Sequence, residues 1–179
     1  MSSPVNRKKQ AETILDILQK KNPNPATELN FSTPWQLLAA AVLSAQSTDK
    51  QVNLVTSKLF KKYPGPEDIA ALTQEQLQDQ IKSIGLFRNK SKNLAAAARQ
   101  IMEIHGGKVP RTREELQHLP GVGRKTANVV LANAFGIPAL AVDTHVFRVS
   151  NRTGLVKAKT PDEAEKQLIR LIPKERWSD

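Results

Sequence analysis

The sequence predicts an all-α protein, and three observations support this fold class. Apolar residues recur at the helical spacing i, i+3, i+4, i+7 through most of the chain. No segment sustains the two-residue alternation of a half-buried strand, and the most strand-like piece, 137–142, is too short to build a sheet alone. Capping residues and glycines stand at the ends of the periodic segments. We therefore expect about nine or ten helices joined by short loops.

Apolar stripes mark the main helices in chain order. Each stripe places its side chains on one face, which can be buried against other helices. The last predicted helix, 161–172, has an apolar side that needs cover, either from earlier helices or from sequence beyond this chain. The stripes comprise Ala11, Ile14, Leu15 and Leu18; Leu37, Leu38, Ala41, Val42 and Ala45; Leu94, Ala98, Ile101 and Met102; Ala127, Val130, Leu131, Ala134 and Phe135; and Ala164, Leu168, Leu171 and Ile172.

Helix boundaries are predicted from threonines and glycines. Thr33 stands before Pro34, which is typical of an N-cap followed by proline in the first helical turn. Other threonines have Gln or Glu at the capping-box spacing, and glycine favours helix ends because it tolerates left-handed backbone angles. The predicted boxes are Thr73 with Gln76, Thr112 with Glu115 and Thr160 with Glu163, and the helix-ending glycines are Gly65, Gly85, Gly106, Gly107 and Gly136.

Composition favours a polyanion as partner. The 179 residues can form one domain or two small ones with a real core. Lys and Arg number 27 against 17 Asp and Glu, for a formal charge of +10. Such a charge steers polyanions toward the protein, although a generally solvated basic surface is the alternative.

Residue content also excludes several classes of site. The chain has no cysteine, which excludes a disulfide, a thiolate-held metal or an iron–sulfur cluster within it. The histidines, His105, His118 and His145, lack zinc-ligand spacing. No window approaches the roughly 18 apolar residues of a membrane span. Residues 1–10 have no apolar signal core, so we expect a cytoplasmic protein.

The most informative segment is 119–126, LPGVGRKT, which joins a short helix over 114–119 to a longer one over 124–135. Pro120 ends the first helix, and the glycines at 121 and 123 allow unusual backbone angles and close approach. Consecutive N–H groups from this turn and the new helix can hold a DNA phosphate without reading sequence. An ordinary tight helix–helix turn is the alternative interpretation, but the joint pattern with Arg124 and Lys125 favours DNA.

Lys125 is a candidate amine nucleophile. A lysine in water keeps its proton until about pH 10.4, and roughly 4 kcal/mol is needed to release it near neutrality. A helix N-terminus disfavours the added cation by only roughly 0.3–1 kcal/mol. Neighbouring Arg124 can help, but desolvation against bound DNA must supply much of the rest. A permanently charged lysine that contacts phosphate is an equally good interpretation of the spacing.

Asp143 is the candidate carboxylate. It follows an apolar run and precedes a helical pattern, so the simplest role is an N-cap. An N-cap aspartate remains ionised, and an ionised carboxylate can stabilise positive charge that develops on a sugar ring. The two roles are compatible.

These residues carry a resemblance to a known family. The segments 119–127 and 142–149, together with 43–49 (LSAQSTD) and 84–90 (IGLFRNK), resemble motifs of the helix-hairpin-helix DNA glycosylases. More narrowly, they resemble the bacterial endonuclease III family. The similarity runs in order from about residue 14 to residue 172.

The resemblance implies an all-α fold of two helical domains with the active site between them. A six-helix domain would span 27–137 and carry the hairpin at about 114–135, and a discontinuous second domain would combine 1–26 with 138–179. It further implies a base-excision repair glycosylase that removes oxidised pyrimidines and nicks the abasic strand. Lys125 falls on the Schiff-base lysine and Asp143 on the catalytic aspartate. The adenine-removing branch typically has serine in place of the lysine, so Lys125 favours lyase activity.

The resemblance also implies a set of DNA-binding residues. Gln46 and Leu86 match positions that fill the gap or wedge the helix after a nucleotide leaves the stack, although packing or capping would explain them equally well from the sequence alone. The expected partner is double-stranded DNA with a damaged pyrimidine or an abasic site, bound by a monomer and associated with the bacterial nucleoid. The full DNA-binding set is Gln46, Leu86, Gly121, Val122, Gly123, Arg124, Thr126, His145 and Arg148.

One departure from the family pattern is expected to matter. Endonuclease III proteins normally hold a [4Fe–4S] cluster with four cysteines in a segment beyond the position of Asp179, so this chain looks truncated and should contain no cofactor. Two alternatives to the repair enzyme remain open. One is a non-catalytic helix-hairpin-helix module that only binds DNA, and the other is a glycosylase with a different lesion preference.

Overall fold

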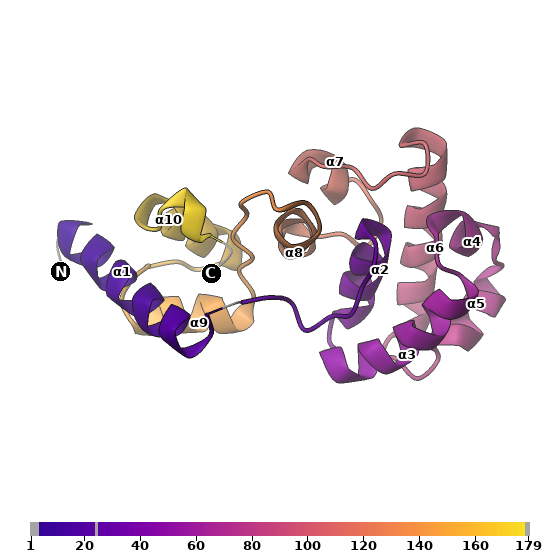
Figure 1. Ribbon diagram of the computed structural model, residues 1–179, viewed down its shortest axis with the longest axis horizontal. Helices are drawn as coiled ribbons and strands as arrows, with labels where there is room; N and C mark the ends of the chain where they lie inside the picture. Colours follow the sequence, from indigo (N-terminus) through magenta and orange to yellow (C-terminus); the bar gives the residue numbers. More distant parts are fainter. Residues whose placement is uncertain (1–3, 24, 178–179) are drawn as a thin grey trace. The chain divides into compact units, whose positions relative to one another are not determined.

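The computed structural model describes residues 4–23 and 25–177 (Figure 1). These residues form ten α-helices and one short 3-10 helix, and they contain no strand. The chain divides into two compact units: a larger one, Thr27–Phe135, and a smaller one, Met1–Ala26 with Gly136–Asp179. The predicted boundary between the two domains lies after residue 137, close to the end of the larger unit at Phe135. It stays a prediction that each unit folds as a domain.

The larger unit holds seven helices, one more than the six that the resemblance implies. The helices are α2 (Pro34–Ser44), α3 (Asp49–Lys62), α4 (Pro66–Ala71), α5 (Gln74–Ile81), α6 (Phe87–Ile104), α7 (Arg113–Gln117) and α8 (Arg124–Phe135).

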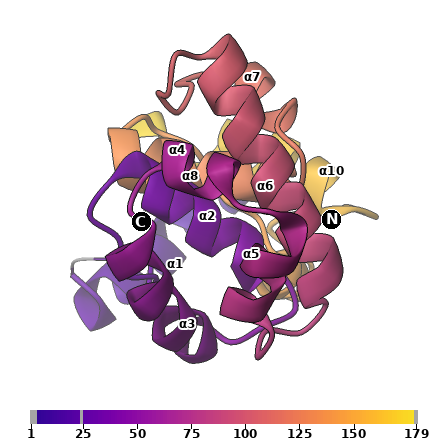
Figure 2. The ribbon, with the colours of Figure 1, turned by 90° about the vertical axis from the view of Figure 1, so that its right-hand side faces the viewer.

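Helix α2 forms the centre of the larger unit. All residues from 35 to 43 are buried, as expected of a helix that is apolar around its whole circumference. It packs against α3, α6 and α8, while α4 and α5 pack on α6. Figure 2 shows α2 among α3, α5 and α6. The polar exception, Gln36, accepts a hydrogen bond from the N–H of Ser32 at 2.9 Å.

The smaller unit consists of α1 (Pro4–Lys21), α9 (Thr144–Arg152), α10 (Pro161–Leu171) and the 3-10 helix Lys174–Arg176. Its core joins Ala11 of α1 to Ala164 and Leu168 of α10. Helix α1 therefore covers the apolar side of α10, which is the first of the two predicted forms of cover. The remaining core residues are Val142, Leu155, Val156 and Ile172.

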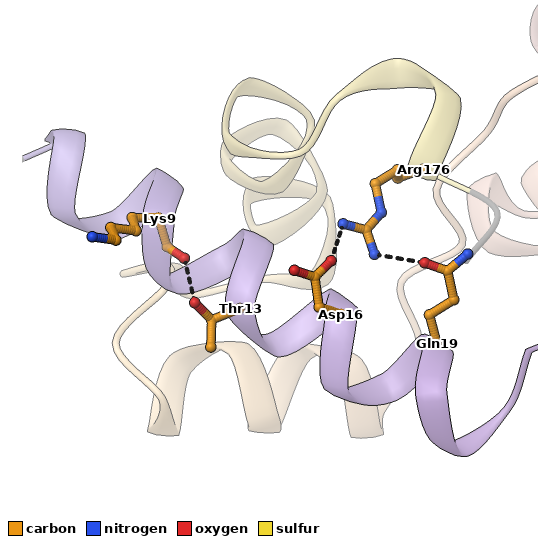
Figure 3. Close-up of polar contacts among 5 residues, drawn as sticks. All are labelled: Lys9, Thr13, Asp16, Gln19 and Arg176. Atoms are coloured by element: carbon orange, nitrogen blue, oxygen red, sulfur yellow. Dashed lines mark hydrogen bonds and ion pairs between the residues drawn. The ribbon is translucent and has the colours of Figure 1, made fainter.

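Polar contacts also join the two ends of the smaller unit. Arg176 donates a 2.8 Å hydrogen bond to the Asp16 carboxylate and a 3.3 Å bond to the Gln19 side-chain oxygen, so its guanidinium bridges two positions of α1 (Figure 3). One turn earlier, the Thr13 hydroxyl donates to the Lys9 carbonyl at 2.9 Å. The Thr13 bond lies within α1, and the two Arg176 bonds hold the C-terminal end of the described chain against this helix.

The predicted N-caps are confirmed, but two of the three capping boxes are not. Thr33, Thr73, Thr112 and Thr160 each accept a hydrogen bond from the expected N–H. The reciprocal bond forms between Gln76 and the Thr73 N–H. By contrast, the Glu115 carboxylate accepts from the Thr112 hydroxyl, and that of Glu163 accepts from the Lys159 N–H. Each carboxylate therefore accepts from a group close to the N-cap main-chain N–H, which is the donor that a capping box would use.

A few other expectations were wrong. Gly65 begins α4 instead of ending a helix. Leu18 is 52% exposed, because the core of the smaller unit reaches only as far as Leu15 along α1. Met102 is 38% exposed and lies over the backbone turn at Gly107 instead of in the core.

No helix among residues 4–23 and 25–177 is long and apolar enough to cross a membrane.

Candidate active site

The predicted helical hairpin is confirmed. Helices α7 and α8 are joined by a tight turn in which the Val122 N–H donates to the Leu119 carbonyl at 3.1 Å. The first bond of α8 follows at once, from the Ala127 N–H to the Gly123 carbonyl at 2.9 Å. The turn therefore leads directly into the helix, as a phosphate-binding hairpin requires.

The two glycines of the turn do different work. Gly121 has φ +78°, and a Cβ built there would lie 2.9 Å from Asn93 Cβ and 3.3 Å from Val42 Cγ1. It is therefore required both by its backbone angle and by close packing on α6 and α2. Gly123 has an ordinary φ, and a Cβ built there would meet nothing within 4 Å. No neighbouring atom of the described chain requires this second glycine, so the space in front of it is open to a ligand.

The start of α8 is an electropositive helix end. Gly123 precedes it and has no side chain with which to cap the first N–H groups. The first turn contains no acidic residue, whereas Arg124 and Lys125 add to the positive end of the helix dipole. Lys125 is exposed, and Arg124 and Thr126 are half-buried. An anion would bind favourably here, and the Lys125 amine would lie within the same turn.

Val122 differs from the rest of the predicted DNA-binding set in that its side chain is buried. Its side chain is 6% exposed, and it anchors the turn with buried Leu119. Its main-chain N–H also bonds within the turn, so Val122 holds the hairpin in shape between the two glycines. From the sequence alone, a valine between two glycines could point inward or outward, so the burial of this side chain was not predictable.

Asp143 is the N-cap of α9, as predicted. Its Oδ1 accepts from the N–H of His145 at 2.9 Å and from that of Val146 at 2.8 Å. Both bonds use the same oxygen, so within the described residues Oδ2 makes no hydrogen bond. One carboxylate can therefore cap the helix and also present an oxygen to a ligand. His145 and Arg148 lie one turn apart on α9, and both are exposed.

Lys125 and Asp143 belong to different units. Within the larger unit, the structure brings Lys125 together with the hairpin glycines, Arg124 and Thr126. Within the smaller unit, it brings Asp143 together with His145 and Arg148 on the first turns of α9.

Gln46 and Leu86 share an unusual backbone. They have φ +57° and +58°, and they are the two non-glycine residues with positive φ within the described ranges. This conformation costs roughly 1–2 kcal/mol for a residue with a side chain. Both side chains are exposed, Leu86 by 58%. The left-handed backbone carries no sequence signal, because neither residue is Gly, Asn or Asp.

Lys90 is a polar residue that sequence reasoning missed. Its side chain is 5% exposed, and the ammonium donates to the Leu43 carbonyl and to the Ser47 hydroxyl, both at 2.9 Å. Burial lowers the pKa of Lys90 below its usual value. The available signal was its place on the apolar stripe of α6, four residues before Leu94.

A cluster-binding site does not fit these residues. The sequence contains no cysteine, and the part of the chain that the structure describes holds no group of three or more His, Cys, Asp or Glu placed to bind a metal. Thiolates are the usual ligands of iron–sulfur clusters. We therefore assign no role to such a group in this chain.

Comparison with known proteins decides the family. The HhH-GPD superfamily of base excision DNA repair proteins matches residues 39–174. The chain belongs to this superfamily. It is 54% identical to endonuclease III of Bacillus subtilis over 95% of this chain and 78% of that protein, and 47% identical to endonuclease III of Escherichia coli K12 over 96% and 81%.

A solved structure gives the same result for the fold. A trapped covalent intermediate of endonuclease III with DNA superimposes with a TM-score of 0.93 at 49% identity, over 99% of this chain and 82% of that one. The predicted family, the all-α fold and the enzyme class, a base-excision DNA glycosylase with abasic-site lyase activity, are therefore confirmed.

Proposed function

We propose that this enzyme removes oxidised pyrimidines from double-stranded DNA and then cuts the abasic strand, with Lys125 as nucleophile and Asp143 as the stabilising carboxylate. The observation that carries the proposal is the exposed Lys125 amine in the first turn of a helix that has no side-chain cap. The endonuclease III that forms a trapped covalent intermediate with DNA is 49% identical to this chain, which supports covalent chemistry here.

The hairpin binds the DNA backbone. Main-chain N–H groups of Gly121 and Gly123, with those at the start of α8, donate to phosphate oxygens, while Val122, whose own N–H bonds to the Leu119 carbonyl, holds the turn in shape. Gly123 leaves open space for this approach, and Arg124 and Thr126 contribute polar side chains. Such contacts carry no sequence information, which suits an enzyme that must find damage in any sequence.

Asp143 acts while the base departs. The bond from C1′ to the base breaks with its electron pair moving to the base, and positive charge develops on the sugar ring. Asp143 Oδ2, the oxygen not used in capping, stabilises this charge. Oδ1 meanwhile keeps α9 in place.

Lys125 completes the reaction. Its uncharged amine attacks C1′ and, after loss of a proton and ring opening, forms an imine. The imine acidifies the C2′ proton, and removal of that proton expels the 3′ phosphate by β-elimination. Water then hydrolyses the imine and restores the Lys125 amine.

Other exposed residues hold the distorted DNA. Gln46 and Leu86 occupy the space that the flipped nucleotide leaves, which offsets part of the few kcal/mol that unstacking costs. Arg148 and His145, both exposed on α9, bind the DNA backbone near the lesion. One chain supplies every one of these groups, which is compatible with the expected monomer.

Borohydride reduction of the imine tests the chemistry. The wild-type protein should form a covalent adduct with duplex DNA that contains an abasic site, and Lys125→Ala should form none while still binding DNA. Lys108→Ala, which removes another exposed lysine of the larger unit, is the charge-matched control and should react normally. Folded wild-type protein that binds abasic DNA without forming an adduct would overturn the proposed mechanism.

Substrate preference needs a separate assay. Duplexes with a single oxidised pyrimidine, a single oxidised purine or no damage should be compared in single-turnover reactions. We expect release of the base from the first alone. Equal release from the oxidised purine would refute the assigned specificity but leave the lyase chemistry standing.

A further inference from the structure

Two loops of the larger unit carry left-handed side-chain residues at their tips. Gln46 lies in the loop after α2, and Leu86 lies immediately before α6. The loops are adjacent, because a Cβ built on Gly85 would lie 3.9 Å from both the Gln46 carbonyl and the Ser47 hydroxyl. We call residues 44–48 and 83–87 the paired loops.

Lys90 is bonded to both of the paired loops. Its main-chain N–H donates to the Leu86 carbonyl at 3.1 Å. Its side chain crosses to the other loop, where the ammonium donates to Ser47 Oγ, and it also donates to the carbonyl of Leu43 in the last turn of α2, at 2.9 Å each. A second link runs from Gln51 Nε2 to Ser83 Oγ at 3.2 Å. Of these residues, Lys90 alone is hydrogen-bonded to both of the paired loops.

General stability does not explain a lysine at this position. The ammonium is buried and, among the described residues, it bonds to one carbonyl and one hydroxyl and to no carboxylate. Removing a charge from water is unfavourable unless an opposite charge or a full set of hydrogen bonds compensates for it. An apolar side chain of the same length, such as methionine, would be buried at this position of α6 without the cost of removing a charge from water. What the ammonium adds is a directed link between two strained loops.

We propose that Lys90 is a positioning residue that fixes the spacing and orientation of Gln46 and Leu86, so that the two side chains enter the DNA stack as one rigid unit. The inference rests on the proposed wedge role of those two residues. Two loops that moved independently would have to be ordered during each insertion, and the ordering would slow the flipping of a nucleotide.

This role predicts a dependence on the opposite strand. Single-stranded abasic DNA has no duplex stack to distort and no gap in a duplex to fill. The Lys90 link should therefore matter for duplex substrates alone. A role in overall folding, or in the Lys125 chemistry, would affect both substrates equally.

The test compares Lys90→Met, which keeps the length of the side chain, with wild-type protein. Single-turnover strand cleavage is measured on abasic duplex and on the same abasic strand alone, at saturating enzyme. We expect the duplex rate to fall about tenfold, with the single-strand rate unchanged. Leu94→Ala is the matched control, because it opens the buried face of the same helix and leaves both loops bonded. It should keep the wild-type ratio of the two rates.

Ser47→Ala keeps the proposal falsifiable if Lys90→Met does not fold. It removes one of the two side-chain bonds of Lys90 and should lower the duplex rate selectively, by less than the lysine variant does. Hydrogen exchange of DNA-free protein should show faster exchange in both paired loops of either variant. An unchanged ratio of duplex to single-strand rates in the folded variants would overturn the proposal.

Failure of the underlying wedge assignment gives a different result. In that case Gln46→Ala and Leu86→Ala would cleave duplex as fast as wild-type protein. Failure of the Lys125 chemistry would abolish cleavage of both substrates by wild-type protein. Neither pattern resembles the selective loss expected for Lys90.

Discussion

The hairpin turn and the paired loops both need left-handed backbone, and they obtain it in opposite ways. The hairpin has glycine at its left-handed position, Gly121, where no side chain would fit. The paired loops have Gln46 and Leu86 there, at roughly 1–2 kcal/mol each. The difference follows from what each region offers to DNA. The hairpin presents main-chain N–H groups, whereas the loops must present side chains and accept the strain.

The largest effect on stability is expected for the hairpin glycine, Gly121. Gly121→Ala should lower the free energy of unfolding by roughly 2–5 kcal/mol, from left-handed strain and from overpacking against Asn93. Chemical denaturation measures it. A change near zero would mean that the hairpin can move away from α6 at little cost.

Leu86→Gly should separate stability from activity. Glycine relieves the left-handed strain, and the leucine is 58% exposed, so little burial is lost. We expect the free energy of unfolding to rise by about 1 kcal/mol while cleavage of duplex DNA falls. Denaturation and single-turnover assays give the two quantities. A loss of stability would show that Leu86 packs more than its exposure indicates.

Gly123→Ser tests whether the empty N-cap of α8 serves a ligand. A serine side chain can accept from the first N–H groups of the helix, which should raise stability by about a few tenths of a kcal/mol. The same oxygen would occupy the proposed phosphate position, so affinity for abasic duplex should fall several-fold. Gly136→Ser, just after α8, is a control outside the hairpin: its left-handed φ of +61° should make the serine variant less stable, but affinity for DNA should not change. Undiminished affinity of the Gly123 variant would argue against phosphate binding here.

The last expected effect concerns the pH dependence of stability. Because burial lowers the pKa of folded Lys90 below the ordinary value of 10.5, the unfolded chain binds the proton more tightly. As the pH rises from the folded pKa to the unfolded one, this group should therefore add stability, by at most about 1.4 kcal/mol for each pH unit crossed. Subtracting the stability of Lys90→Met measured at each pH isolates the contribution. A difference that is flat with pH would mean that the ammonium is well solvated.

The sequence predicts regular structure well because local patterns determine it. Thr33 and Asp143 are N-caps as predicted, and the hairpin has its predicted helices, since capping and periodicity act within a few residues. Gly65 shows the limit of such rules, because glycine at an N-cap and glycine at a helix end look alike in a sequence.

Features set by tertiary contacts were not predictable in this way. Lys90 meets Leu43 and Ser47, which lie more than 40 residues earlier in the chain, and no local rule pairs them. The inward direction of Val122 likewise depends on how the hairpin sits on α2 and α6. The roles of Lys125 and Asp143 came from the family resemblance, because spacing alone left a phosphate contact and a helix cap as equal or better interpretations.

The central claim is that the Lys125 amine forms the covalent bond to DNA, and mass spectrometry of the borohydride-trapped adduct tests it most directly. Trypsin cuts after Arg124 but not after a modified lysine, so the account predicts a DNA-linked peptide that runs from Lys125 to Arg148. The unmodified peptide from Thr126 to Arg148 should be depleted in proportion. An adduct located on any other lysine, with Lys125 cleaved normally, would contradict the account.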